Sequence, residues 1–121
     1  MNVANVVNDL VGYDNLKIVQ NSKYFNFSLE SVMIPKFCVL KNNMKIIDFC
    51  TGNAPIPMIL STLTDSNIIG VELQKEIYDL AVQSIMINNL EDRITLLNMN
   101  VLDIFNVYET DSFDLITSNP P

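Results

Sequence analysis

The sequence from residue 45 onward predicts an α/β fold built on a doubly wound parallel sheet. Short apolar runs alternate there with stretches whose apolar residues recur at helical spacing, which is typical of parallel strands joined by helices. Two of the apolar runs carry an acid at or near their ends, Asp48 and Glu72. No repeat, low-complexity tract or flexible linker interrupts the 121 residues, which are enough for one core.

Four strands and two helices are expected in this part of the chain. The strands are predicted at residues 45–49, 67–73, 94–99 and 113–118, and the helices near 56–63 and 75–88. The second helix has one face at the 3.6-residue period, formed by Ile77, Leu80, Ala81, Ser84, Ile85 and Asn88. Right-handed crossovers would place the strands side by side, with a ligand crevice at their carboxyl ends.

Residues 1–44 are predicted to form an N-terminal extension made of a short hairpin and a helix. Residues 16–20 and 24–27 alternate apolar and polar side chains around Asn21 and Ser22, which favours a hairpin. Ser28 is expected to cap a helix that runs to about residue 40. Pro35 should bend or shorten this helix because proline removes a backbone donor.

Composition and charge exclude several classes of protein. No apolar run approaches the roughly 18 residues that cross a bilayer, and the N-terminus lacks the basic region of a secretory signal, so a cytoplasmic protein is expected. The chain has no histidine, and Cys38 and Cys50 lie in no metal-binding pattern, so neither a metal site nor a structural disulfide is expected.

The net charge of −7 is unevenly distributed. Residues 1–45 carry five lysines against three acids, whereas residues 46–121 carry one lysine and one arginine against eleven acids. If the protein contacts a polyanion, the first third of the chain is therefore the expected place. Scattered, solvated lysines are an alternative explanation of the same excess of positive charge.

The segment after the first strand, residues 48–54, has the pattern of a ligand-binding loop. Backbone amides at a turn before a helix are unpaired and attract polar ligand groups, while Gly52 gives backbone freedom and Asp48 offers a carboxylate. The GxGxxG pattern of dinucleotide sites is missing, and an ordinary strand-to-helix turn would look similar.

Two further acids follow the next strands. Glu72 lies 20 residues after Gly52, the spacing at which an acid commonly accepts hydrogen bonds from ribose hydroxyls in nucleoside-binding βαβ units; the alternative is a solvated acid at a strand end. Asp103 follows the third strand and suits either the amino group of a bound adenine or the cap of the next helix.

The fourth strand runs into Asn119, Pro120 and Pro121. An asparagine oxygen and the adjacent proline carbonyl are two fixed acceptors, suited to holding both hydrogens of a conjugated NH2 group. Such a grip frees the nitrogen lone pair for attack on a methyl donor without a strong general base. Asn-Pro alone is a common turn, so the interpretation of this segment as an NH2-binding site depends on the sites that precede it.

Together these segments resemble class I S-adenosylmethionine (SAM)-dependent methyltransferases that modify conjugated amino groups. Three N-terminal segments, Leu10 to Tyr13, Ile18 to Asn21 and Phe25 to Ser31, resemble the bacterial enzymes that N6-methylate an anticodon-loop adenine of valine tRNA. The resemblance implies a Rossmann-like methyltransferase sheet, of which the chain holds the first four strands. Residues 45–121 would then be a truncated SAM-binding half, because an aromatic residue and three more strands should follow Pro121.

The same resemblance implies roles for individual residues. Asp48, Thr51, Gly52 and Asn53 would form the SAM loop, with Glu72 at the ribose and Asp103 at the cofactor adenine. Asn119 and Pro120 would hold the target nitrogen, and Phe27, Ser28 and Pro121 would contribute to substrate binding. The loop departs from the family pattern, since Cys50 and Ala54 replace two glycines.

The expected function is therefore methyl transfer from SAM to the exocyclic N6 of adenine in RNA, with tRNA as the partner. Glutamine N5-methylation of a protein release factor uses the same Asn-Pro-Pro chemistry, although those enzymes carry a larger helical N-terminal domain. A DNA adenine methyltransferase and a noncatalytic SAM-binding fragment are the remaining alternatives.

Overall fold

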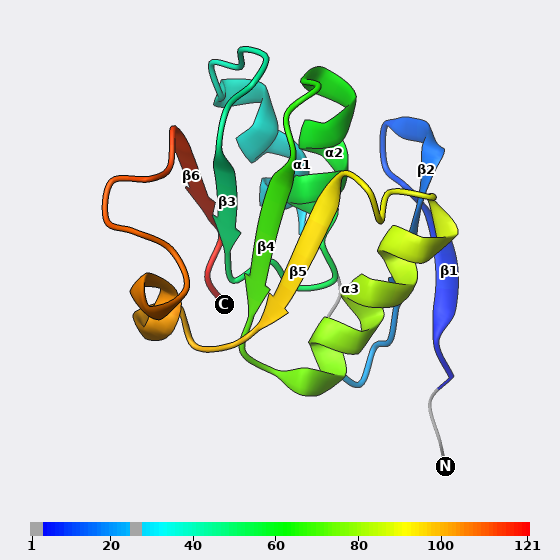
Figure 1. Cartoon of the computed structure of the whole chain (residues 1–121). Coiled ribbons are helices and arrows are strands. Elements are labelled where there is room, and N and C mark those ends of the chain that lie inside the picture. The colour runs from blue at the N-terminus through cyan, green and yellow to red at the C-terminus, as the bar shows by residue number, and fades with distance from the viewer. Residues whose placement is uncertain (1–3, 25–27) are drawn as a thin grey trace.

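The computed structural model describes residues 4–24 and 28–121 (Figure 1). Its centre is a four-stranded parallel sheet in the order β5-β4-β3-β6. The strands are β3 (Ile46–Phe49), β4 (Ile68–Glu72), β5 (Ile94–Asn98) and β6 (Leu115–Ser118). All four predicted strands are confirmed, with ends that differ by at most two residues. The strand order reverses between β3 and β6, where an open α/β sheet forms its ligand crevice.

Two helices connect the strands and cover one face of the sheet. They are α2 (Pro55–Leu63) and α3 (Lys75–Ile87), and both confirm the sequence prediction. The prolines Pro55 and Pro57 lie in the first turn of α2, where a missing backbone donor costs no helical hydrogen bond. The predicted face of α3 is buried except at Asn88, which lies just after the helix and is partly buried.

The hairpin was predicted from the wrong pair of segments. β1 (Val6–Leu10) pairs antiparallel with β2 (Tyr13–Gln20), and the two are joined at Val11 and Gly12. Gly12 has φ +85°, a left-handed conformation that glycine adopts without a steric penalty, so the turn forms there. Most of the other expected strand, residues 25–27, lies outside the described part of the chain.

The predicted N-terminal helix is present but shorter than expected. α1 (Leu29–Met33) is followed directly by the 3-10 helix η1 (Ile34–Phe37), so helical structure ends three residues before the expected end near residue 40. Pro35 lies in η1, as expected for a residue that interrupts an α-helix. Ser28 occupies the N-cap position, but its hydroxyl makes no capping hydrogen bond.

The hairpin lies beside the helices and shares their core (Figure 1). The Ser84 hydroxyl of α3 accepts a hydrogen bond from the Val19 backbone amide at 2.9 Å. The Asn88 side chain accepts from the Lys17 amide at 2.8 Å and donates to the Lys17 carbonyl at 2.7 Å. Leu16 and Ile18 of β2 belong to the same apolar cluster as Ile46 and Ile59, and the division at residue 44 stays a prediction.

The two faces of the sheet have separate apolar clusters, as expected because successive side chains of a strand point to opposite faces. Ile46, Ile68 and Ile94 pack with α2, α3 and β2. On the other face Ile47 and Val71 pack against Ile104 of the 3-10 helix η2 (Val101–Asn106).

Candidate functional site

Asp48 is completely buried inside the fold and links two segments of the site. Its Oδ2 accepts a hydrogen bond from Thr51 Oγ1 at 2.7 Å, and its Oδ1 accepts from Thr117 Oγ1, also at 2.7 Å. Burial raises the pKa of Asp48 to about 7, assisted by repulsion from Glu72 and opposed by the two hydroxyl hydrogen bonds. Asp48 therefore connects the loop after β3 to β6.

The loop after β3, residues 50–54, is tightly wound. Cys50, Gly52 and Ala54 all have positive φ, at +56°, +61° and +72°. Only glycine adopts this conformation without strain, so the two positions at which the sequence departs from the family's glycines are strained. The Thr51 amide donates to the Val71 carbonyl at 2.9 Å, which attaches the loop to β4.

Gly70 is a residue of the site that the sequence reasoning did not identify. A Cβ at this position of β4 would lie 2.9 Å from Thr51 Oγ1 and 3.0 Å from Leu96 Cδ2. Glycine therefore lets the loop pack directly on the neighbouring strand. The available signal was a glycine inside an apolar strand, which often marks a close approach of another segment.

Glu72 holds the same loop from the other side. Its Oε1 accepts from the Gly52 amide at 3.0 Å, and its Oε2 accepts from the Gln74 amide at 2.9 Å. Only 8% of the residue is exposed, so the alternative of a solvated acid at a strand end is wrong. Each carboxylate oxygen still has a lone pair for a further donor.

Asn53 connects the loop to the N-terminal hairpin. It is fully buried, and its Nδ2 donates to the Val19 carbonyl at 3.0 Å. Its Oδ1 is buried and has no hydrogen-bond partner among the described residues. Thr51 and Asn53 therefore support the loop from within the fold.

A cavity of about 350 Å³ lies at the carboxyl ends of the strands. This volume falls in the range of roughly 300–1,000 Å³ that is common for small-molecule sites. Four residues predicted from the sequence line it: Gly52, Glu72, Asn119 and Pro121. Asp48, Thr51 and Asn53 are buried and do not line it, and Pro120 is exposed and does not line it either.

Tyr24, Gln74 and Asn100 are among the lining residues that the sequence reasoning missed. Asn100 is the N-cap of η2, with its side chain accepting from the Leu102 amide at 2.9 Å, so the alternative that Asp103 caps this helix is wrong. Asp103 is exposed in the first turn of η2 and does not line the cavity.

Asn119 lies against the start of α1. Its Nδ2 is 3.2 Å from both Ser28 Oγ and Ser31 Oγ. Ser28 therefore lies beside the residue predicted to hold the target nitrogen. Phe27, the other N-terminal residue predicted to bind substrate, lies outside the described residues.

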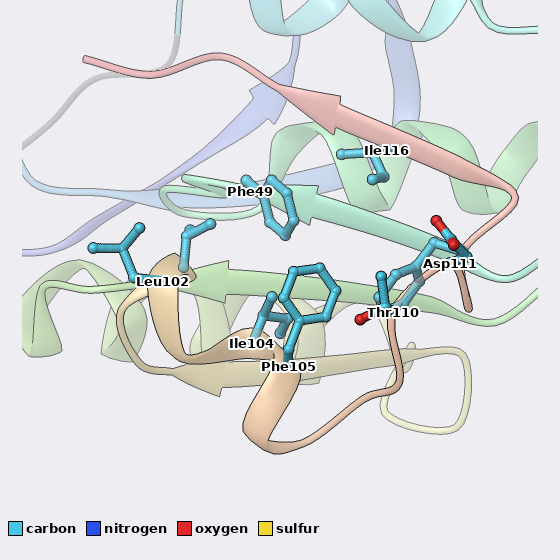
Figure 2. Close-up of a pocket in the computed structure, with 9 residues that line it drawn as sticks. Phe49, Leu102, Ile104, Phe105, Thr110, Asp111 and Ile116 are labelled. Carbon is cyan, nitrogen blue, oxygen red and sulfur yellow. The ribbon is translucent and has the colours of Figure 1, made fainter.

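A second cavity, of about 370 Å³, lies on the other face of the sheet between η2, β3 and β6 (Figure 2). Phe49, Ile104, Phe105 and Ile116 make it largely apolar, and Thr110 and Asp111 supply polar groups. None of the residues predicted to bind a ligand lines it. The first cavity is therefore the candidate site.

The residues that the structure describes contain no group of three or more histidine, cysteine or acidic side chains able to hold a metal ion. Within the same residues, no helix is long and apolar enough to span a membrane.

The curated proteins that this chain resembles are methyltransferases. No family model matches the chain. It is 34% identical over 82 residues to the release factor glutamine methyltransferase of Clostridium botulinum, which is 67% of this chain and 29% of that protein. It is 31% identical over 94 residues to the tRNA1(Val) (adenine(37)-N6)-methyltransferase of Mannheimia succiniciproducens, which is 76% of this chain and 38% of that protein. The chain thus spans about a third of the length of these curated relatives.

Solved structures share the fold. TYW2 of P. horikoshii in complex with MeSAdo superposes with a TM-score of 0.76 at 22% identity, covering 93% of this chain and 41% of that one. TrmK of M. capricolum in complex with S-adenosyl-homocysteine gives 0.64 at 18% identity, covering 76% and 40%. These similarities confirm the Rossmann-like methyltransferase fold and the predicted resemblance.

Proposed function

We propose that the protein is a SAM-dependent methyltransferase that methylates the exocyclic N6 of adenine in RNA, with tRNA as the substrate, and that it acts in the cytoplasm. One observation carries the proposal: Asn119 lines the same cavity as Gly52 and Glu72, at the carboxyl ends of the strands. Asn119, which can accept from an amino group, and Glu72, which can accept from ribose hydroxyls, therefore line one cavity of suitable volume. The named tRNA relative supports this choice of substrate.

The chain's residues fit SAM as the cofactor. Glu72 offers a nearly buried carboxylate with lone pairs for ribose hydroxyls, and its charge suits a sulfonium cation. Asp48, Thr51 and Asn53 hold the loop that carries Gly52. Asn100, which lines the cavity, is better placed than the exposed Asp103 for a contact with the cofactor adenine. When bound, SAM supplies an electrophilic methyl group.

The target amino group would be held at the end of β6. Asn119 Oδ1 and the Pro120 carbonyl would accept its two hydrogens, leaving the nitrogen lone pair free. This lone pair would form the bond to the methyl carbon while the carbon–sulfur bond breaks, and the electrons of that bond would stay on the departing sulfur as a neutral thioether. The nitrogen loses one proton to solvent after transfer, so no strong base is needed. Tyr24 lines the same cavity and offers an aromatic face on which a base can stack, and Pro121 adds an apolar contact.

Glutamine N5-methylation is the second candidate, because a carboxamide also presents a conjugated NH2 group. The glutamine methyltransferase relative supports it at 34% identity. The tRNA methyltransferase relative matches more of this chain, 76% against 67%, which favours adenine as the target. A third outcome is a noncatalytic SAM-binding protein.

The first experiment is calorimetric titration of the chain with SAM. Glu72→Gln should abolish saturable binding, whereas Glu76→Gln, the same change at an exposed acid of α3, should leave it intact. The second is incubation with radiolabelled SAM and either unmodified tRNA or a release factor. N6-methyladenosine in the digested tRNA supports the proposal. Label in glutamine supports the alternative, and binding without transfer to either supports a noncatalytic role.

A further inference from the structure

The side-chain amide of Asn119 is held by two serines that lie about ninety residues earlier in the chain. Asn119 Nδ2 is 3.2 Å from Ser28 Oγ and 3.2 Å from Ser31 Oγ, and the two hydroxyl oxygens are 3.4 Å apart. Ser31 is only 3% exposed, so water does not compete freely for its hydroxyl. Two acceptors thus converge on one end of the carboxamide.

The hydrogen-bonding pattern around Ser28 gives this contact a direction. Asn119 Nδ2 is the donor to both serine oxygens. A hydroxyl oxygen keeps lone pairs for such a donor even when its own proton is used elsewhere. The lone pairs of Ser28 Oγ then face Asn119, where only the NH2 end of the carboxamide can donate to them.

The opposite end of the carboxamide is therefore the one left for the cavity. Asn119 lines this cavity together with Glu72 and Gly52. A carboxamide has a donor at one end and an acceptor at the other, and the two orientations have nearly the same shape. Without the two serine contacts, the Asn119 side chain would be free to present either end to a ligand.

We propose that Ser28 and Ser31 are positioning residues that fix Asn119 with Oδ1 toward the cavity, so that the site selects an amino group and rejects a carbonyl at the reacting position. The choice of ligand in this inference rests on the proposed function. The orientation of Asn119 rests only on its contacts with the two serines. Adenosine and inosine are suitable probes, because they differ at this position by an amino group and a carbonyl.

The geometry is tested by amide exchange measured with NMR on the whole chain labelled with ¹⁵N. The Asn119 side-chain NH2 signal is identified by its loss in N119D, and exposed Asn106 gives the reference rate. Protons held by two hydroxyls should exchange at least about tenfold more slowly than those of Asn106, and the double variant S28A/S31A should remove this protection. Exchange as fast as that of Asn106 in the unmodified chain would overturn the inference.

The selectivity is tested by titrating adenosine and inosine into the same proteins. We expect the unmodified chain to prefer adenosine by about tenfold, and S28A/S31A to lose most of this preference. N119D provides the matched background, because a carboxylate presents an acceptor at either end. Adding S28A/S31A to N119D should therefore leave the preference unchanged.

An equal loss of preference in both backgrounds would show that the serines act only through packing, and would overturn the inference. S28T/S31T keeps both hydroxyls and should retain the preference, which guards against a variant that merely unfolds. If the unmodified chain binds neither nucleoside, the proposed function fails, while the exchange rates still decide the orientation of Asn119.

Discussion

Replacing Asp48 with asparagine should remove most of the pH dependence of stability between pH 5 and pH 8. Burial raises the pKa of Asp48 in the folded chain to about 7, against 3.8 for an ordinary aspartate side chain. The folded state therefore binds more protons than the unfolded state between these values, and stability falls as the pH rises through this window. With these two pKa values, the free energy of unfolding decreases by about 2.5 kcal/mol from pH 5 to pH 8.

Urea unfolding followed by circular dichroism at pH 5, 6, 7 and 8 measures this slope. Asp48→Asn removes the titrating group while keeping its shape, so its curve should be nearly flat over the same range. Asp92→Asn, a change at an exposed acid, should keep the slope of the unmodified chain. A flat profile for the unmodified chain, or a steep one for Asp48→Asn, would refute the assignment of the proton to this carboxyl group.

Three other changes test the packing around the loop and the cavity. Cys50→Gly relieves a residue held at φ +56° and should raise the free energy of unfolding by about 1 kcal/mol in urea titrations. Gly70→Ala places a Cβ 2.9 Å from Thr51 Oγ1 and should lower the free energy of unfolding by about 1–3 kcal/mol. The same change should cost less in a Thr51→Ala protein, where the clashing hydroxyl is absent. Tyr24→Leu removes an aromatic face from the cavity and should weaken adenosine binding by about 1–3 kcal/mol in calorimetry, while Tyr24→Phe should not.

The central sheet could be predicted because its strands are continuous apolar runs. Strands of a parallel sheet are covered on both faces, so β3 and β4 appear in the sequence without alternation and with clear ends. The hairpin gave no such signal. Val6 and Val7 of β1 are each 51% exposed, and its tight turn depends on Gly12, which is not part of a recognised turn pair.

The site was predicted to the level of its segments but not of its contacts. Strand order brings the ends of β3, β4 and β6 together, so the cavity contains Gly52, Glu72 and Asn119 as expected. The contact between Asn119 and Ser28 joins residues 91 positions apart, and no local pattern encodes it. The sequence also could not reveal that the Asp48 carboxylate faces two hydroxyls inside the fold.

Asp48 is buried inside the fold, whereas Glu72 lines the cavity, and this difference changes how the site should be tested. Asp48 and Glu72 hold the same loop from two sides, one through Thr51 and the other through Gly52. Loss of SAM binding in Asp48→Ala would follow from a displaced loop and would not demonstrate contact with the cofactor. Glu72 both supports the loop and lines the cavity, so Glu72→Gln, which keeps the size and one acceptor, separates the two roles better than truncation. If Glu72→Gln leaves the free energy of unfolding within about 0.5 kcal/mol but abolishes binding, the carboxylate acts on the ligand; a matching loss of stability would assign it to the loop.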